Sequence, residues 1–219
     1  LTEQIKQLAK NEWVKSSGFN AVYFGGGTPT ALPASLFFGL LDTICKHLPV
    51  SADAEITLES TITDLDETYL ERLSESRINR VSIGIQTFQE DLRKNYNRTA
   101  TNDELVQKIN EIKNAGIINL CADLMYNLNG QTEESWKRDL QLIKTLQING
   151  CSVYPLLPFP SAPLVKSGKY TEPNPEKEYQ FFKLADDYLT SLTDWQVITA
   201  VQYGHKISGN ATHIELQAE

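Results

Sequence analysis

Residues 117–125 read IINLCADLM, a largely apolar run in which Asp123 stands between apolar neighbours. Residues 103–114 precede this run with the apolar spacing of a helix, and Gly116 stands where that helix is expected to end. A helix, a short turn and a buried strand form the repeating unit of parallel α/β folds. This stretch therefore predicts that class of fold, and it leaves Asp123 as the polar residue to be explained.

The same alternation runs along most of the chain. We expect strands at residues 21–24, 55–59, 80–85, 117–125 and 152–157, and helices at 2–15, 34–48, 63–73, 103–114, 132–146 and 175–192. Strands that alternate with helices of this length predict a parallel sheet with helical crossovers. A doubly wound sheet and a barrel both obey this pattern, so periodicity alone does not choose between them.

Two further features concern the ends of helices and the extent of the fold. Thr63 with Asp66 resembles a capping box, and Thr132 is expected to cap the helix that follows it. We divide the chain into a core of residues 1–165 and a C-terminal helix with an incomplete extension, residues 166–219. The polar tail after Tyr203 is weakly patterned, and we expect it to be poorly packed.

Composition and charge exclude several classes of protein. The formal net charge is −8, which disfavours a nucleic-acid partner, because phosphate-binding proteins usually carry the opposite charge balance. No apolar run is long enough to cross a bilayer, and no secretory segment opens the chain. The three cysteines are far apart and odd in number, so they suggest neither disulfides nor a metal cluster, and a reducing cytoplasm fits best. The first residue is Leu1 in a helical pattern, so we expect the true N-terminus to lie upstream.

Candidate binding residues follow from the rule that active sites of parallel α/β folds gather at the carboxyl ends of the strands. Three glycines, Gly25 to Gly27, end the first strand and leave their peptide groups open to a ligand. Glu59 closes the second strand and Gln86 the third, and Arg98 follows twelve residues later. Asp123 is the strongest candidate, because an aspartate among large apolar neighbours is costly to bury unless it is paired.

Each of these residues has an ordinary alternative explanation. Three glycines form tight turns without binding anything, and a strand-end Glu or a helix-side Arg is more often a solvated surface group. The joint placement of four polar groups after successive strands is harder to attribute to chance. We therefore predict that they converge on one binding site.

Four segments resemble a known family. They are YFGGGTPT at residues 23–30, NRVSIGIQTF at 79–88, Asn97–Arg98, and DLMY at 123–126 followed by GQT at 130–132. Together these segments are similar to the radical S-adenosylmethionine (SAM) proteins typified by oxygen-independent coproporphyrinogen oxidase. The resemblance extends from about residue 20 to about residue 160, with the motifs in the family's order.

The resemblance implies a fold, cofactors and roles for particular residues. The fold would be a partial (β/α)6 barrel, and the cofactors would be SAM and a 4Fe–4S cluster, reduced by a donor such as flavodoxin or ferredoxin. One-electron cleavage of SAM would give a 5′-deoxyadenosyl radical that takes hydrogen from a substrate. The resemblance assigns the amino-acid end of SAM to Gly26, Gly27 and Thr28, and the rest of SAM to Glu59, Gln86, Arg98, Asp123 and the backbone near Leu157.

Two departures from the family pattern matter. The family's cluster-binding CxxxCxxC motif is absent here, and Cys45, Cys121 and Cys151 cannot replace it. We expect the cluster cysteines to lie upstream of Leu1, the alternative being that the protein is an inactive relative. Asn127 and Asn129 also replace a family Gly and Pro before Gly130, which is expected to reshape the mouth of the site.

The segment YPLLPFPSAPL, residues 154–164, bears on the substrate. It is closer to the haem-utilisation branch of the family than to the haem-chaperone branch, whose glutamate is replaced here by Pro158. The first hypothesis is therefore an enzyme that acts on a porphyrin or haem by decarboxylation or by radical methyl transfer. The second is a haem-binding trafficking protein, and the third is an α/β domain without cofactor that would tolerate Asp123→Ala and Glu59→Ala.

Overall fold

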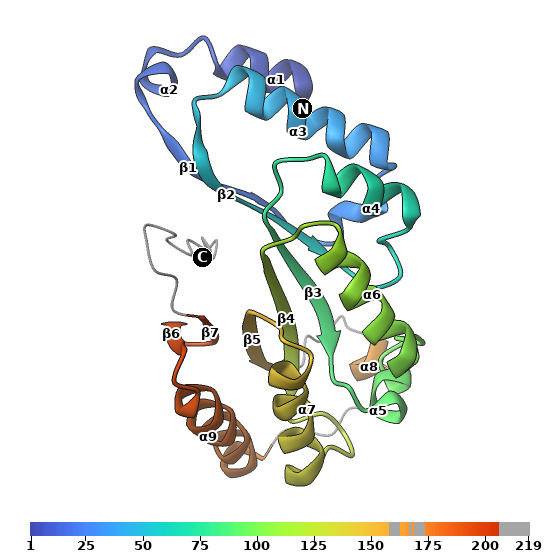
Figure 1. The fold of residues 1–219 in the computed structure, drawn as a ribbon. Helices are drawn as coiled ribbons and strands as arrows, with labels where there is room; N and C mark the ends of the chain where they lie inside the picture. The colour runs from blue at the N-terminus through green and yellow to red at the C-terminus, as the bar shows by residue number, and fades with distance from the viewer. Residues whose placement is uncertain (158–162, 167, 169–173, 206–219) are drawn as a thin grey trace.

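The computed structural model describes residues 1–157, 163–166, 168 and 174–205. Its centre is a curled, mostly parallel sheet with the strand order β1-β2-β3-β4-β5-β7-β6 (Figure 1). Strands β1 to β5 pair in parallel with their neighbours, and β7 and β6 extend the sheet antiparallel. The strands are β1 (Phe19–Phe24), β2 (Val50–Ser60), β3 (Arg80–Gln86), β4 (Asn119–Tyr126), β5 (Gly150–Pro155), β6 (Trp195–Thr199) and β7 (Gln202–His205).

The helices lie along the outer side of this curved sheet (Figure 1). This arrangement is a half-barrel, so of the two topologies that the sequence leaves open the barrel is confirmed. The helices are α1 (Thr2–Leu8), α2 (Glu12–Ser16), α3 (Ala34–His47), α4 (Glu67–Ser74), α5 (Glu90–Asn95), α6 (Asn102–Asn114), α7 (Glu133–Thr145), α8 (Pro163–Lys166) and α9 (Pro175–Ser191), with a 3-10 turn at Pro29–Ala31.

Alternation along each strand gives the sheet two different faces. The outward residues are apolar, fully buried and part of one core cluster with the helices: Ile56, Leu58, Val81, Ile83, Ile85, Leu120, Ala122, Leu124 and Val153. Each Val, Leu or Ile side chain among them contributes about 1.5–3 kcal/mol of burial free energy. The intervening residues face the concave side and are mostly polar: Thr57, Glu59, Arg80, Ser82, Gln86, Asn119, Asp123, Ser152 and Gln202.

Two helix boundaries differ from the sequence predictions. The single helix expected at residues 2–15 is two helices, because the chain turns at residues 9–11 and the Asn11 side chain accepts a hydrogen bond from the Trp13 N–H to start α2. The capping box expected from Thr63 is wrong. Asp66 itself caps α4 by accepting a 2.8 Å hydrogen bond from the Tyr69 N–H.

The end of the described chain is better packed than the sequence suggests. Residues 195–205 form the β6–β7 hairpin, in which Tyr203 is buried and its hydroxyl donates a 2.9 Å hydrogen bond to Asp186. Residues 206–219, where the rest of the weakly patterned tail falls, lie outside the described residues. The domain boundary at residue 165 stays a prediction. No helix in the described part of the chain is long and apolar enough to cross a membrane.

Gly150 offers a test of the register between β4 and β5. A Cβ atom on Gly150 would lie 2.6 Å from the Cys121 Sγ, which is closer than real contacts allow. We expect Gly150→Ala to lower the free energy of unfolding by about 1–3 kcal/mol because the two side chains would overlap. Urea denaturation measures this change.

Cys121→Ala in the same chain should recover most of that loss, since it removes the atom that Gly150→Ala would meet. Gly39→Ala on α3 is the matched control, because a Cβ atom there meets nothing within 4 Å. The control should raise stability by up to about 1 kcal/mol. If Cys121→Ala does not recover the stability that Gly150→Ala loses, the register between β4 and β5 is contradicted.

Candidate functional site

The glycine turn joins β1 to the 3-10 turn and lies beside the end of β2. Gly26 and Gly27 have φ angles of 80° and 95°, which side chains rarely adopt. A Cβ atom on Gly25 would lie 2.8 Å from the Glu59 Oε2 and 2.4 Å from the Tyr23 ring. The sequence therefore needs glycine here for two reasons, a left-handed backbone and a close approach of Glu59.

Glu59 connects three pieces of the site. It accepts a short hydrogen bond from the Tyr23 hydroxyl on β1 and a 3.2 Å hydrogen bond from the Gly26 N–H. Behind it, the hydroxyls of Thr30 and Ser60 lie 2.8 Å apart in a buried contact that fixes the turn against the end of β2. The glycine turn and the Glu59 carboxylate thus form one rigid unit.

Gln86 and Arg98 meet over Gly84, which has no side chain to separate them. The Gln86 Nε2 lies 3.0 Å and the Arg98 Nη2 3.6 Å from the point where a Cβ atom of Gly84 would stand. Gln86 has a φ angle of 69°, and its position at the end of β3 coincides with a register shift against β4. A glutamine in this conformation is strained, which is typical of functional positions.

Asp123 belongs to the same face of the sheet. Its Oδ1 accepts a 3.1 Å hydrogen bond from the Ser82 hydroxyl, and its Cα is paired with that of Gly84. Ser82 in turn is paired with Glu59 across β2 and β3. Register therefore brings Glu59, Asp123 and the Gln86–Arg98 pair to one concave surface, although Asp123 lies in mid-strand and not at the strand end.

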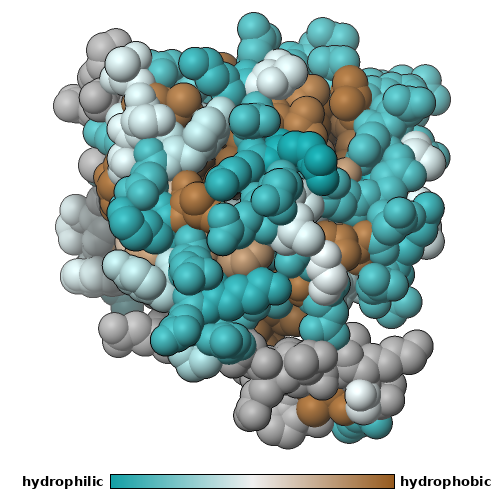
Figure 2. Space-filling view, turned by 90° about the horizontal axis from the view of Figure 1, so that it is seen from below, coloured by the Kyte–Doolittle hydropathy of each residue, from teal (hydrophilic) through white to brown (hydrophobic). Residues whose placement is uncertain are grey.

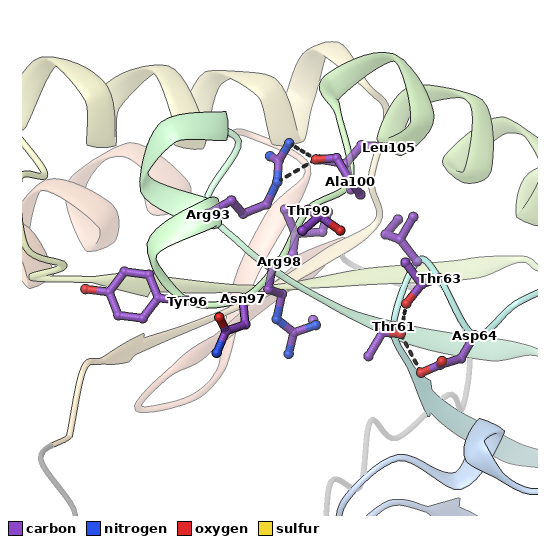
Figure 3. Close-up of a pocket in the computed structure, with 13 residues that line it drawn as sticks. Thr61, Thr63, Asp64, Arg93, Tyr96, Asn97, Arg98, Thr99, Ala100 and Leu105 are labelled. Atoms are coloured by element: carbon purple, nitrogen blue, oxygen red, sulfur yellow. Dashed lines mark hydrogen bonds between the residues drawn. The ribbon is translucent and has the colours of Figure 1, made fainter. Parts of the chain in front are cut away.

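A cavity of about 390 Å³ opens beside Arg98. It lies between the β2–α4 loop, which contributes Thr61 and Asp64, and the connection from α5 to α6 (Figure 3). The Thr61 hydroxyl donates a 2.5 Å hydrogen bond to Asp64, so this wall is ordered. The volume is within the range of pockets that hold small molecules.

The surface around the carboxyl ends of the strands is mainly hydrophilic. Figure 2 shows the end of the molecule toward which β3 points in Figure 1, with hydrophobic residues in separate small groups. Leu157 lies at this end, two residues beyond β5, and its side chain is exposed. The role expected for the backbone near Leu157 stays a prediction, and residues 158–162 lie outside the described part of the chain.

Some concave residues were missed from the sequence. Tyr23 donates a hydrogen bond to Glu59, and Ser82 donates one to Asp123. Met125, two residues after Asp123 on β4, is the cross-strand partner of Tyr154 on β5. The signal that could have found them is parity, because each is an even number of residues from a predicted site residue in its own or the paired strand. Asn127, where the family has glycine, keeps a left-handed φ of 62°, which asparagine tolerates.

The cysteines do not form a metal site. Cys121 and Cys151 lie on neighbouring strands but on opposite faces, and burial raises the pKa of the Cys151 thiol well above its usual value. Within the described residues, no group of three or more His, Cys, Asp or Glu side chains could hold a metal ion.

The family model of the radical SAM superfamily matches residues 1–143. The chain is 28% identical over 207 residues to the anaerobilin synthase of Escherichia coli O157:H7, covering 93% of the chain and 46% of the relative. It is 35% identical over 136 residues to the heme chaperone HemW of Lactococcus lactis, covering 62% of the chain and 36% of the relative.

Among solved structures, the chain matches coproporphyrinogen III oxidase (HemN) from Escherichia coli, described as a radical SAM enzyme, with a TM-score of 0.75. The identity is 23%, and the match covers 93% of this chain and 49% of that structure. This likeness supports the half-barrel fold predicted from the motifs. The chain spans about half the length, or less, of these three relatives.

The left-handed backbone at Gln86 gives a first test of the site. Gln86→Gly removes steric strain but adds chain entropy to the unfolded state, so we expect stability to change by less than about 1 kcal/mol. Gln147→Gly, at a φ of 51° outside the site, is the matched control and should behave alike. Chemical denaturation measures both, and a loss above about 2 kcal/mol for Gln86→Gly alone would show that its side chain serves the fold.

Proposed function

Because this chain belongs to the radical SAM superfamily, we propose that its concave site binds SAM for chemistry on a porphyrin or haem. The intact protein would carry out that chemistry together with a 4Fe–4S cluster. The observation that carries this proposal is the convergence of Glu59, Gln86, Arg98 and Asp123 beside the glycine turn. Alternation alone would place polar residues on this face, but it does not require a strained glutamine or a glycine beneath two donors.

The site has the donors and acceptors that SAM needs. SAM carries a carboxylate, an ammonium, a sulfonium and two ribose hydroxyls, so it requires groups of both signs. We assign its amino-acid end to the peptide groups of Gly26 and Gly27 and to Thr28, next to Glu59, which already accepts a hydrogen bond from the Gly26 N–H. The rest of the molecule is assigned to Glu59, the amide of Gln86, the guanidinium of Arg98, the carboxylate of Asp123 and the backbone at Leu157.

The cluster does not fit the residues described here. Cys45 is on α3, while Cys121 and Cys151 point to opposite faces of the sheet, so they cannot share an iron–sulfur cluster. We propose that its ligands are the cysteines expected upstream of Leu1. No role of this chain's residues depends on them.

The chain's own residues bind, orient and shield the cofactor. Once bound, SAM supplies the family's hydrogen-abstraction chemistry to a substrate over the concave face. Glu59 fixes the glycine turn, and Arg98 with Gln86 offers hydrogen-bond donors aimed at one point above Gly84. The buried residues beneath, including Arg80 and Ser152, close the base of the half-barrel to water.

Porphyrin or haem is proposed as substrate on two grounds. The segment at residues 154–164 is nearest to the haem-utilisation branch, and relatives named anaerobilin synthase, heme chaperone and coproporphyrinogen III oxidase all match this chain. The two reactions under consideration are oxidative decarboxylation and methyl transfer with ring opening, with flavodoxin or ferredoxin as electron donor. A haem chaperone is the second candidate, and the 35% identity with HemW favours it.

Cofactor binding can be measured on the 219-residue chain itself. We expect SAM to bind by calorimetry at millimolar ligand, and Arg98→Ala to weaken binding about 10- to 100-fold, since a hydrogen bond to a charged group contributes about 1.5–3 kcal/mol. Arg138→Ala, an exposed arginine on α7, is the control and should leave affinity unchanged. Equal affinities for all three proteins would refute a SAM site at this surface.

Enzyme and chaperone are separated with the intact protein, reconstituted anaerobically with iron and sulfide. An enzyme should consume SAM only when haem or a porphyrin is added, and give 5′-deoxyadenosine or S-adenosylhomocysteine. Asp123→Asn should abolish this substrate-dependent consumption of SAM while leaving the iron content unchanged. Stable haem binding without substrate-dependent consumption of SAM would instead identify the chaperone.

A further inference from the structure

Asp139 is a charged residue buried far from solvent on the helix side of the sheet. It lies on α7, its exposed fraction is 0%, and the proposed cofactor site does not use it. A buried carboxylate must be compensated by hydrogen bonds or opposite charge, because its desolvation is costly. The hydrogen-bond partners of Asp139 therefore identify the part of the chain that it holds.

The Asp139 carboxylate accepts three hydrogen bonds from the turn that follows Gln86. Its Oδ2 accepts from the Thr87 hydroxyl at 2.6 Å, and its Oδ1 accepts from the Phe88 N–H at 3.0 Å and the Gln89 Nε2 at 2.9 Å. These three consecutive residues leave β3 directly after the left-handed Gln86. Asp139 therefore holds the segment that directly follows the strained Gln86.

Arg93 holds the same turn from the other side. Its exposed fraction is 1%, and its Nη1 donates to the Thr87 carbonyl at 2.9 Å. Thr87 is thus bound through its hydroxyl by α7 and through its carbonyl by α5. Its N–H donates to the Ile85 carbonyl at 2.9 Å, which closes the turn around Gln86.

Arg93 also forms hydrogen bonds with the backbone at Arg98 and at Ala100. The Arg98 N–H donates to the Arg93 carbonyl at 3.1 Å, and the Arg93 guanidinium donates to the Ala100 carbonyl through Nη2 at 2.6 Å and Nε at 3.2 Å. Figure 3 shows the two arginines pointing in opposite directions, Arg93 toward Ala100 and Arg98 away from it. The peptide of Arg98 is therefore fixed on both sides by contacts of one buried residue.

We propose that Asp139 and Arg93 are positioning residues that act through Thr87 to set where the Gln86 amide and the Arg98 guanidinium meet over Gly84. This inference rests on the proposed function, because it treats Gln86 and Arg98 as the groups that contact SAM. Neither is assigned a contact with the cofactor: Asp139 is fully buried, and Arg93, although it borders the cavity beside Arg98, has an exposed fraction of only 1%. They make the geometry of two donors depend on a network on the opposite face of the sheet.

The test compares variants of Thr87 in the 219-residue chain. Thr87→Val keeps the shape but loses the hydroxyl that Asp139 binds, while Thr87→Ser retains it. Asp139→Asn removes one acceptor, and Ile112→Val in the core of α6 is a control that lowers stability away from the site. SAM affinity by calorimetry and the side-chain N–H resonances of Gln86 and Arg98 in NMR spectra without ligand are both recorded where all variants are folded.

We expect Thr87→Val and Asp139→Asn to weaken SAM binding about 2- to 30-fold and to shift both side-chain resonances. Thr87→Ser, which keeps the hydroxyl, should leave the SAM affinity and both resonances as they are in the unchanged chain. Ile112→Val should change neither readout. In a chain that carries Gln86→Ala and Arg98→Ala, Thr87→Val should weaken binding no further, because the groups it positions are gone.

Two results would overturn the inference in distinguishable ways. If Gln86→Ala and Arg98→Ala leave SAM affinity unchanged, the proposed function of this site fails. If those variants weaken binding but Thr87→Val and Asp139→Asn behave like Ile112→Val, the site stands and the positioning role is wrong. Should Thr87→Val not fold, Gln89→Ala removes one contact of Asp139 at a half-buried position and is expected to give about a 2-fold loss, with no loss as the contrary result.

Discussion

The strict division of the sheet into an apolar face and a polar face is the constraint on which the rest of this structure depends. Parallel strands covered by helices on both sides are apolar throughout, whereas these strands alternate. Leu58 and Ile83 pack into the helix-side core, and their neighbours Glu59 and Ser82 face the concave side. A shift of register by one residue would exchange the two sets, so hydrophobic burial itself keeps the binding groups aligned.

Within that frame, two glycines decide how closely the binding groups approach. Gly25 lets the Glu59 carboxylate lie against the backbone of the turn, and Gly84 lets Gln86 and Arg98 meet above β3. An alanine at either place would put a methyl group where a carboxylate or an amide now stands. The site therefore depends on the absence of side chains at Gly25 and Gly84 as much as on the polar side chains around them. The apolar core behind the sheet offsets the loss of stability at these positions.

The sequence could predict the fold class and the alternation of parallel strands with helices from the hydrophobic pattern, and the barrel from the order of its motifs. Period-two alternation also shows which strand residues share the concave face. It could not predict the β6–β7 hairpin, since five and four residues give too short a pattern and their pairing with β5 is long-range. α5 was missed for the same reason of length. The network of Asp139 and Arg93 was hidden because a charged residue on a helix is usually solvated, and nothing local marks these two as buried.

The relatives named synthase and chaperone match this chain in sequence, and the oxidase structure shares its fold, so the fold by itself does not separate the three activities. A cofactor site of this kind needs rigidity, because a small displacement of a donor costs much of its interaction with a charged ligand. Substrate choice needs the opposite, namely a surface free to vary without disturbing the donors. The turn that carries Gln86 is tied through Thr87 to buried charged residues behind the sheet, and the open concave face next to it contributes little to the core. Under the proposed function, substitutions on that open face would change the substrate while the cofactor geometry stays fixed.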